Sequence, residues 1–213
     1  MHDLTLHIIT VFMGFFAIMN PLGNLSIFLS MVEGMDPRLQ RQIAFKASLT
    51  AFTIVTVFCV FGHFIFKLFG ITLPAFEIAG GIIVFFIGYQ LLNAKTNTLH
   101  RDPNISPEQI QKQANDLAIA PLGIPLMAGP GTISAAMNFV GAEKSIWNVL
   151  LVVGVFLFMC VLTYIVFISG KKLTSKLDPG IIKAISRIMG LILTIIAVQM
   201  VISGVYGAIH LFP

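Results

Sequence analysis

The sequence predicts an all-α polytopic membrane protein, and its composition and its hydrophobic runs are the observations that predict it. Hydrophobic residues make up 57% of the 213 positions and charged residues only 10%, and the mean hydropathy is +0.94. A soluble domain carries about 25% charged residues. The apolar residues gather in runs of roughly 20, the length of a helix that spans a hydrocarbon core about 30 Å thick. The alternation of β-barrel strands is absent, so we expect transmembrane helices.

Six hydrophobic runs predict six transmembrane helices. In chain order they are Leu4–Met31, Ile43–Phe69, Glu77–Asn93, Leu117–Val140, Trp147–Gly170 and Ala184–Leu211. The first run lacks a basic leader and a small-residue cleavage site, so we expect a retained helix rather than a signal peptide. The polar stretch 95–116 is the only substantial linker, and its Ser106-Pro107 pair predicts the start of a short surface helix. Asp36-Pro37 and Asp178-Pro179 predict capped helix starts in the same way.

The lysine and arginine residues predict the orientation of these helices. The loops after spans one, three and five, with the adjoining helix ends, contain 11 of the 13 basic residues: Arg38, Arg41, Lys46, Lys95, Arg101, Lys112, Lys171, Lys172, Lys176, Lys183 and Arg187. The loops after spans two and four contain Lys67 and Lys144, and the termini contain none. By the positive-inside rule the first set of loops is cytoplasmic and both termini lie outside.

An internal repeat appears when the chain is compared with itself at an offset of 109 residues. One offset aligns a mid-span proline, a small residue and a mid-helix glutamine: Pro21 with Pro130, Gly81 with Gly190, and Gln90 with Gln199. We therefore divide the chain into a three-helix repeat at 1–94, a cytoplasmic linker at 95–116 and a second three-helix repeat at 117–213. Because each half has three spans, the second half enters the membrane from the opposite side and has the inverted topology. The distribution of basic residues indicates the same inversion. Such inverted repeats are typical of secondary transporters.

Two stretches interrupt the first and fourth spans near their centres. They read "MNPLGN" at 19–24 and "GPGTIS" at 129–134. Proline removes a backbone donor and glycine lets the backbone unwind, which hydrocarbon tolerates only beside protein or water. We expect helices one and four to be broken mid-membrane and the breaks to meet there, so that half-helix ends offer partial charges of both signs to a small zwitterion. The alternative is a pair of kinks that neighbouring helices repair.

The candidate site residues come from these breaks and from polar positions elsewhere in the spans. We assign substrate binding to Asn20, Pro21, Gly23, Asn24, Gly129, Pro130, Gly131, Thr132 and Ser134, and cavity lining to Asn138, Gln90, Gln199 and Thr53. Each has a structural alternative. The two asparagines near Pro21 could repair its break, Ser134 could cap a helix, the glutamines could join helices, and Thr53 could bond its own helix. Gly81 and Gly88 have the spacing of a packing face.

Several chemistries have no support in the sequence. All nine carboxylates lie in loops or at helix ends, so no mid-span acid is present for a catalytic dyad, a proton relay or a metal. We therefore expect neither an enzyme nor a bound cofactor. Cys59 and Cys160 lie inside spans and should behave as small apolar residues. The basic residues are scattered through loops, which argues against nucleic acid as a partner. Sodium and protons both stay open as coupling ions, and the oligomeric state is open too.

Four motifs resemble those of a known family. "NPLGNLSIFLSM" (20–31), "EIAGG" (77–81), "PLGIPLMAGPGTIS" (121–134) and "RIMGLIL" (187–193) are similar to the signatures of the MarC-related family, which is also classed with the neutral amino acid transporters. The resemblance covers nearly the whole chain. It implies a six-helix protein of the cytoplasmic (inner) membrane of bacteria or archaea. Some members resemble transporters of glycine, alanine and related amino acids, while others are named for multiple antibiotic resistance.

The sequence and the resemblance together favour a secondary transporter of small neutral amino acids. It would work by alternating access, with its site at the two broken helices. A channel or an efflux protein for another small solute is the alternative, because meeting half-helices also occur in channels.

Overall fold

The computed structural model describes residues 2–32, 34–93, 107–141, 145–174 and 179–211. These residues are almost entirely helical, and no β-strand occurs among them, as the sequence predicts. The elements are α1 (His2–Met19), α2 (Pro21–Met31), α3 (Pro37–Phe69), α4 (Leu73–Leu92), α5 (Pro107–Leu117), η1 (Ala118–Met127), α6 (Pro130–Val140), α7 (Ile146–Thr174) and α8 (Pro179–Leu211). The segment η1 has the wider turns of a π-helix.

Helix length and composition agree with a polytopic membrane protein. Within the described ranges, four helical stretches are long and apolar enough to cross a membrane: Leu4–Leu29, Pro37–Phe69, Ile146–Gly170 and Gly190–His210. The bent pair of η1 and α6 makes a fifth. The apolar stretch of α4, Leu73–Tyr89, falls among the shorter helices. By these criteria the structure supports four to five spans, where the sequence predicts six.

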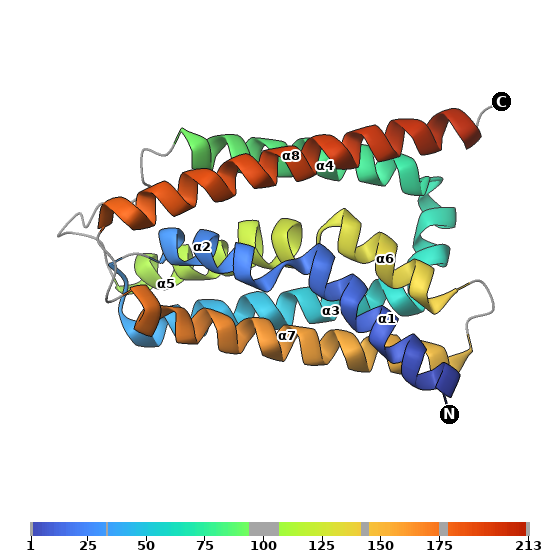
Figure 1. Ribbon diagram of the computed structural model, residues 1–213, viewed down its shortest axis with the longest axis horizontal. Coiled ribbons are helices and arrows are strands. Elements are labelled where there is room, and N and C mark those ends of the chain that lie inside the picture. The colour runs from blue at the N-terminus through green and yellow to red at the C-terminus, as the bar shows by residue number, and fades with distance from the viewer. Residues whose placement is uncertain (1, 33, 94–106, 142–144, 175–178, 212–213) are drawn as a thin grey trace.

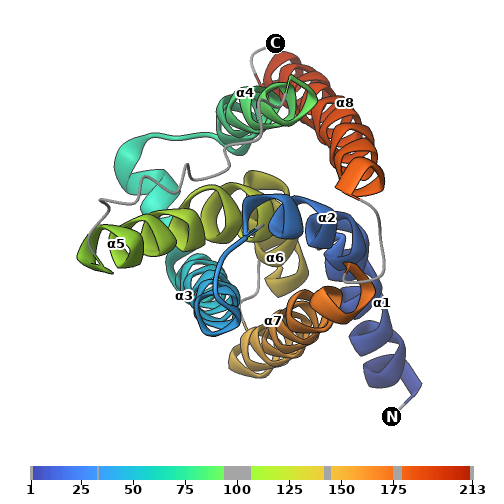
Figure 2. The same ribbon diagram turned by 90° about the vertical axis from the view of Figure 1, so that its left-hand side faces the viewer.

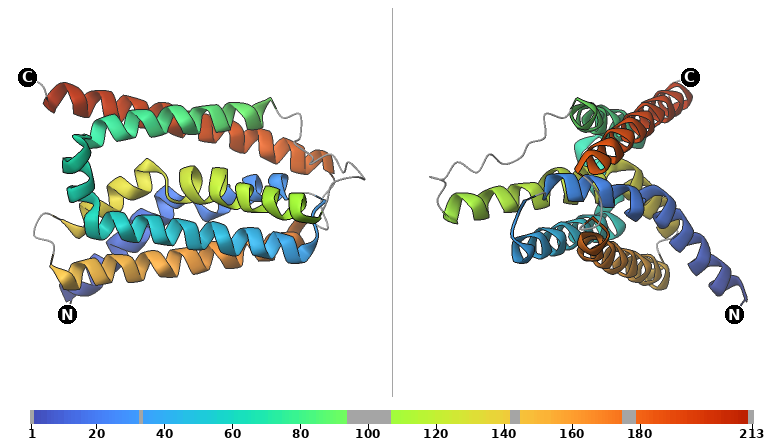
Figure 3. Two further views of the ribbon diagram at one scale, coloured as in Figure 1. Left: turned by 180° about the vertical axis from the view of Figure 1, so that it is seen from behind. Right: turned by 60° about the vertical axis from the view of Figure 1, so that its left-hand side comes forward.

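The helices run back and forth between two ends of the molecule (Figure 1). α1 and α2 follow one another from the end that holds both termini to the opposite end, and α3 returns. α4 then leads to the linker end, where α5 begins. α5, η1 and α6 come back together, and α7 and α8 complete the path. The view from behind in Figure 3 also places both termini at one end.

The predicted helix starts are confirmed where the structure describes them. α3 begins at Pro37, earlier than the apolar run at Ile43, because the Asp36 carboxylate accepts a hydrogen bond of 2.7 Å from the Arg38 N–H and caps the helix. α5 and α8 begin at Pro107 and Pro179, as the proline pairs predict. The preceding residues, Ser106 and Asp178, lie outside the described ranges.

The helix expected in the linker is present and lies largely at the surface, but it is not separate from the helix that follows. α5 continues directly into η1, which has one non-helical residue, Ala120, near its start. One side of α5 is buried through Ala114, and the Lys46 ammonium of α3 donates a hydrogen bond of 2.6 Å to the Asn115 Oδ1. α5 is therefore the polar beginning of the fourth span and packs against α3.

The helix bounds repeat at the offset found in the sequence. α2 and α6 each have 11 residues and begin at Pro21 and Pro130, which are 109 positions apart. α3 and α7 begin at Pro37 and Ile146, with the same separation. The local structure of the two halves therefore follows the same plan through the break and the start of the next helix.

Each half also closes its short helix with an amide side chain from the helix that follows. In the second half the Asn148 Nδ2 donates to the carbonyls of Phe139 and Val140 at 2.9 and 2.8 Å. In the first half, Gln40 donates to two carbonyls at the end of α2 and in the loop that follows, those of Val32 and Met35 at 3.2 and 3.0 Å. These bonds satisfy carbonyls that a helix end leaves free.

α4 and α8 pack along each other and form a pair on one side of the other helices (Figure 2). Glycines make the close contact possible. A Cβ at Gly81 would lie 2.8 Å from the Ala197 carbonyl oxygen, and one at Gly88 would lie 2.8 Å from the Thr194 backbone nitrogen. The expected packing role of these two glycines is therefore confirmed.

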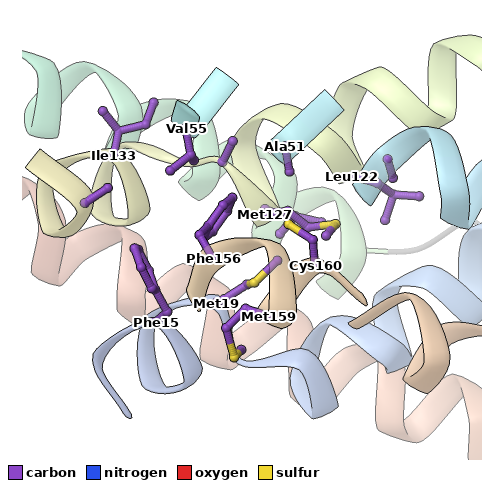
Figure 4. Packing of buried hydrophobic residues seen from close by; sticks show 14 of the residues in the cluster. Phe15, Met19, Ala51, Val55, Leu122, Met127, Ile133, Phe156, Met159 and Cys160 are labelled. Atoms are coloured by element: carbon purple, nitrogen blue, oxygen red, sulfur yellow. The ribbon is translucent and has the colours of Figure 1, made fainter. Parts of the chain in front are cut away.

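The aromatic and sulfur-containing core joins α1 and α2 to α7. Phe15 and Phe156 have ring centroids 4.9 Å apart, and Phe28 stacks on Phe167 at 4.5 Å. Figure 4 shows Phe156 with Met19 and Met159 in this packing. Cys59 and Cys160 are buried and free, as expected for small apolar residues.

Candidate functional site

The first span is broken at Asn20. This residue has φ 40° and ψ 67°, and within the described residues it is the one non-glycine with a positive φ. α1 ends at Met19 and α2 begins at Pro21, so the break lies where the sequence predicts it. Proline cannot donate a backbone hydrogen bond, and the left-handed residue before it redirects the chain.

Two asparagines stabilise the backbone on either side of this break. The Asn20 Oδ1 accepts a hydrogen bond of 3.1 Å from the Gly23 N–H and thereby caps the start of α2. The Asn24 Nδ2 donates a hydrogen bond of 2.7 Å to the Met19 carbonyl at the end of α1. Both side chains therefore satisfy backbone groups at the break, which is the alternative to substrate contact that the sequence suggested.

The second break is built differently. The last wide turn of η1 closes with a hydrogen bond of 2.9 Å from the Ala128 N–H to the Gly123 carbonyl. Gly129 is then extended, and α6 starts at Pro130 with its axis bent by 52° from the preceding helix. A Cβ at Gly129 would lie 2.4 Å from the Pro125 carbonyl oxygen, so a side chain at this position would require the backbone to shift.

Both breaks line one cavity of about 70 Å³. From the first break it is lined by Ile18, Met19, Asn20, Asn24 and Ile27, and from the second by Pro125, Leu126, Gly129, Pro130, Gly131 and Thr132. The α4–α8 pair supplies the remaining wall: Val84, Ile192, Leu193, Ile196 and Met200. The two interruptions therefore meet, as expected from the sequence, and the helix pair covers their meeting point.

The other predicted site residues whose side chains the structure describes lie outside this lining. Pro21 and Gly23 are buried behind the first break, and Ser134 is buried with a hydroxyl that has no hydrogen-bond partner in the structure. Asn138, Gln199 and Thr53 are exposed, and the Thr53 hydroxyl donates to the Leu49 carbonyl of its own helix. The side chain of Gln90 lies outside the described part of the structure. Apart from Gln90, none of these positions belongs to the described cavity wall.

Sequence reasoning missed the apolar wall of the cavity. Val84 of α4 and Leu193 of α8 are buried there, and Ile196 and Met200 lie further along α8. These residues do not differ from the other aliphatic residues of their helices, so no sequence signal marks them. The repeat could have pointed to them, because it pairs α4 with α8.

The cavity is electrically neutral but polar at its breaks. The described residues that line it carry no charged side chain. Nor does the described part of the chain contain a group of three or more His, Cys, Asp or Glu residues that could hold a metal ion. The polar groups are the Asn20 and Asn24 amides, the Thr132 hydroxyl and the backbone at the starts of the two short helices, where the helix dipole places partial positive charge. Such a site suits a small solute without net charge.

Comparison with known proteins identifies relatives along nearly the full chain. Residues 5–209 match the model of the family described as MarC family integral membrane proteins. The chain is 39% identical over 209 residues to the UPF0056 membrane protein YvbG of Bacillus subtilis (strain 168), covering 97% of this chain and 96% of that protein. It is 31% identical over 202 residues to the UPF0056 inner membrane protein MarC of Salmonella paratyphi A, covering 91% of each.

An archaeal relative shows the same degree of coverage. A UPF0056 membrane protein of Pyrococcus horikoshii is 36% identical over 198 residues, which cover 93% of this chain and 94% of that protein. No solved structure matches the chain.

Proposed function

Because the chain belongs to the MarC family of integral membrane proteins, we propose that it is a secondary transporter of small neutral amino acids. It moves a solute of the size of glycine or alanine across a prokaryotic cytoplasmic membrane by alternating access. The observation that carries this proposal is the cavity at which the two interrupted spans meet. Broken helices that meet inside a membrane protein are a recurrent way to build a transport site.

The size of the cavity supports a small solute. A buried water needs about 10–15 Å³, so a cavity of about 70 Å³ holds on the order of five water-sized groups. That room suits the few non-hydrogen atoms of glycine or alanine. The neutral lining supports a solute without a charged side chain, because an unpaired charge there would lose its hydration without compensation.

The same proposal includes six spans arranged as two inverted three-helix repeats. The shared offset of 109 residues in the bounds of α2 and α6 and in the starts of α3 and α7 supports it. α4 is 20 residues long, and although its apolar stretch is the shortest, a helix of that length reaches across a thin or locally adapted bilayer. The path between two ends of the molecule agrees with this count (Figure 1).

Alternating access needs two bodies that move relative to each other around the site. α4 and α8 contact each other along their length. The pair contacts the second break at Gly80, which packs against the ring of Pro130. The cavity lies between this pair and the two breaks. We propose that the pair moves against the remaining helices and exposes the cavity to each side in turn.

Flux in proteoliposomes tests the proposal. We expect the purified protein to carry labelled glycine or alanine with a rate that saturates, under an inward gradient of sodium or protons or by exchange. Val84→Phe would fill the cavity and abolish flux, since Val84 lines it and is 4% exposed. Val57→Phe is the matched control, because Val57 lies on the outer face of α3 and is 40% exposed.

The same flux measurements distinguish the proposed transporter from the alternative, a channel or an efflux protein. Uptake that grows linearly with solute concentration would favour a channel. Transport of a different small solute, with no flux of any small amino acid under either gradient, would favour an efflux protein and overturn the substrate assignment.

A further inference from the structure

The two short helices that meet at the cavity start in chemically different ways. α2 has Asn20 at its cap position, and its side chain satisfies the Gly23 N–H. At the equivalent position of the other half, 109 residues on, the chain has Gly129, and α6 has no side-chain cap. The pseudo-symmetry of the fold is therefore broken at the site itself.

The uncapped start of α6 leaves hydrogen-bond donors facing the cavity. The Ile133 N–H bonds to the Gly129 carbonyl at 3.0 Å, while the N–H groups of Gly131 and Thr132 have no acceptor among the described residues. Both residues line the cavity. A helix start with free N–H groups binds anions, because the donors and the helix dipole act in the same direction.

A side chain supplies a third, independent donor at the same place. Thr132 is 2% exposed and lines the cavity, and within the described chain its hydroxyl has no hydrogen-bond partner. A hydroxyl at the cavity that no protein group occupies can donate its hydrogen bond to a ligand. Two backbone donors and one hydroxyl together match the oxygens of a carboxylate.

The first break presents the opposite polarity. Asn24 is 6% exposed and lines the cavity, and its Nδ2 is used by the Met19 carbonyl. The Oδ1 of the same amide has no donor among the residues that the structure describes. An acceptor in this position suits an ammonium group, which carries only donors.

We propose that the solute binds in one orientation, with its carboxylate at the α6 start, on Gly131 and Thr132, and its ammonium group on the Asn24 Oδ1. The assignment rests on the proposed function, since it takes the transported solute to be an amino acid. The α2 start is the poorer carboxylate site, because Asn20 already occupies the Gly23 donor there.

Ligand analogues on the purified protein test the orientation without transport. Thermal stability would be measured against increasing glycine, acetate and glycinamide at constant ionic strength, and the apparent affinity follows from how the stabilisation grows with ligand concentration. Glycine keeps both charged groups, acetate keeps the carboxylate alone and glycinamide the ammonium alone. We expect glycine to bind best.

The matched variant is Thr132→Val, which removes the hydroxyl and nearly preserves the volume. It should lower the affinity for glycine and for acetate by roughly tenfold or more, because only a carboxylate uses the hydroxyl. The affinity for glycinamide should stay within about twofold of that of the wild type. Thr132→Ser should recover most of the loss. Thr10→Val removes an exposed hydroxyl that bonds the Leu6 carbonyl and should change none of the three affinities.

Each other result has a defined meaning. Equal loss for all three ligands in Thr132→Val, or glycinamide binding as tightly as glycine, would overturn the orientation. The proposed function fails separately: acetate binding that depends on Thr132, together with no flux of any amino acid, would retain the carboxylate site and reject the amino acid as solute. Saturable glycine flux that is unaffected by Thr132→Val would retain the amino acid as solute and reject the carboxylate site at Thr132.

Discussion

The Asn24 side chain donates a hydrogen bond of 2.7 Å to the Met19 carbonyl, five residues earlier and on the other side of the break. The bond fastens the end of α1 to the first turn of α2 at a buried position. Without it, the Met19 carbonyl would face the apolar interior with no donor, because the Gly23 N–H, four residues on, bonds to the Asn20 Oδ1 instead.

Loss of this bond should destabilise the protein. We expect Asn24→Ala to lower the free energy of unfolding in detergent by about 1–3 kcal/mol, since a buried acceptor is left unsatisfied. Asn93→Ala is the matched control, because its amide also donates to a carbonyl, that of Tyr89 at 3.0 Å, but at an exposed position. Thermal or denaturant unfolding of both variants measures the difference. Equal stabilities would contradict the role given to Asn24.

The contact of Gly80 with Pro130 should tolerate no side chain. A Cβ at Gly80 would lie 1.8 Å from the Pro130 Cγ, so Gly80→Ala must push α4 away from the second break. We expect Gly80→Ala to lower the free energy of unfolding by about 1–3 kcal/mol. At Gly154 of α7, nothing lies within 4 Å of the added Cβ, and Gly154→Ala should raise stability by about 0.5–1 kcal/mol. Unfolding of the two variants side by side checks the opposite signs.

Asn148 should stabilise the C-terminal end of α6 through three bonds. Its Nδ2 donates to the Phe139 and Val140 carbonyls, and its Oδ1 lies 2.9 Å from the His7 Nε2. Asn148→Ala should cost about 1–3 kcal/mol in unfolding experiments. Asn148→Asp keeps an acceptor for His7 but turns a second oxygen toward two carbonyls, so it should be at least as unstable. An aspartate variant of wild-type stability would show that only the His7 contact matters.

The orientation in the membrane can be read from two cysteine substitutions. Ser145 precedes α7 and Arg38 lies in the first turn of α3, and both are exposed. If both termini lie outside, a membrane-impermeant maleimide should label Ser145→Cys on intact cells and Arg38→Cys only after permeabilisation. The native Cys59 and Cys160 are each 3% exposed and should give little background. The reverse labelling pattern would invert the topology.

Much of the fold could be predicted because prolines and glycines act locally. The starts of α2 and α6 at Pro21 and Pro130 follow from the fixed proline geometry and its missing donor. The start of α3 follows equally from the Asp36 cap. These features depend on a few neighbouring residues, which a single sequence contains in full.

The residues that line the cavity could be predicted only in part, because helix rotation is set by packing. Asn138 and Thr53 are polar residues in helices near the site, yet both face outward. α4 is apolar all around, so its sequence does not show that Val84 faces the cavity. The π-helical turns of η1 have no sequence signal of this kind, and they rotate the residues that follow.

The difference between Asn20 and Gly129 has a consequence for the empty protein. If the protein alternates between two open forms as proposed, chemically identical halves would make the form open to the cytoplasm and the form open to the outside equivalent by symmetry and equally populated. A left-handed asparagine with its own cap on one side and a bare glycine on the other remove that equality. The unloaded protein would then populate one of the two open forms more than the other, and a solute would bind first from the side to which that form opens.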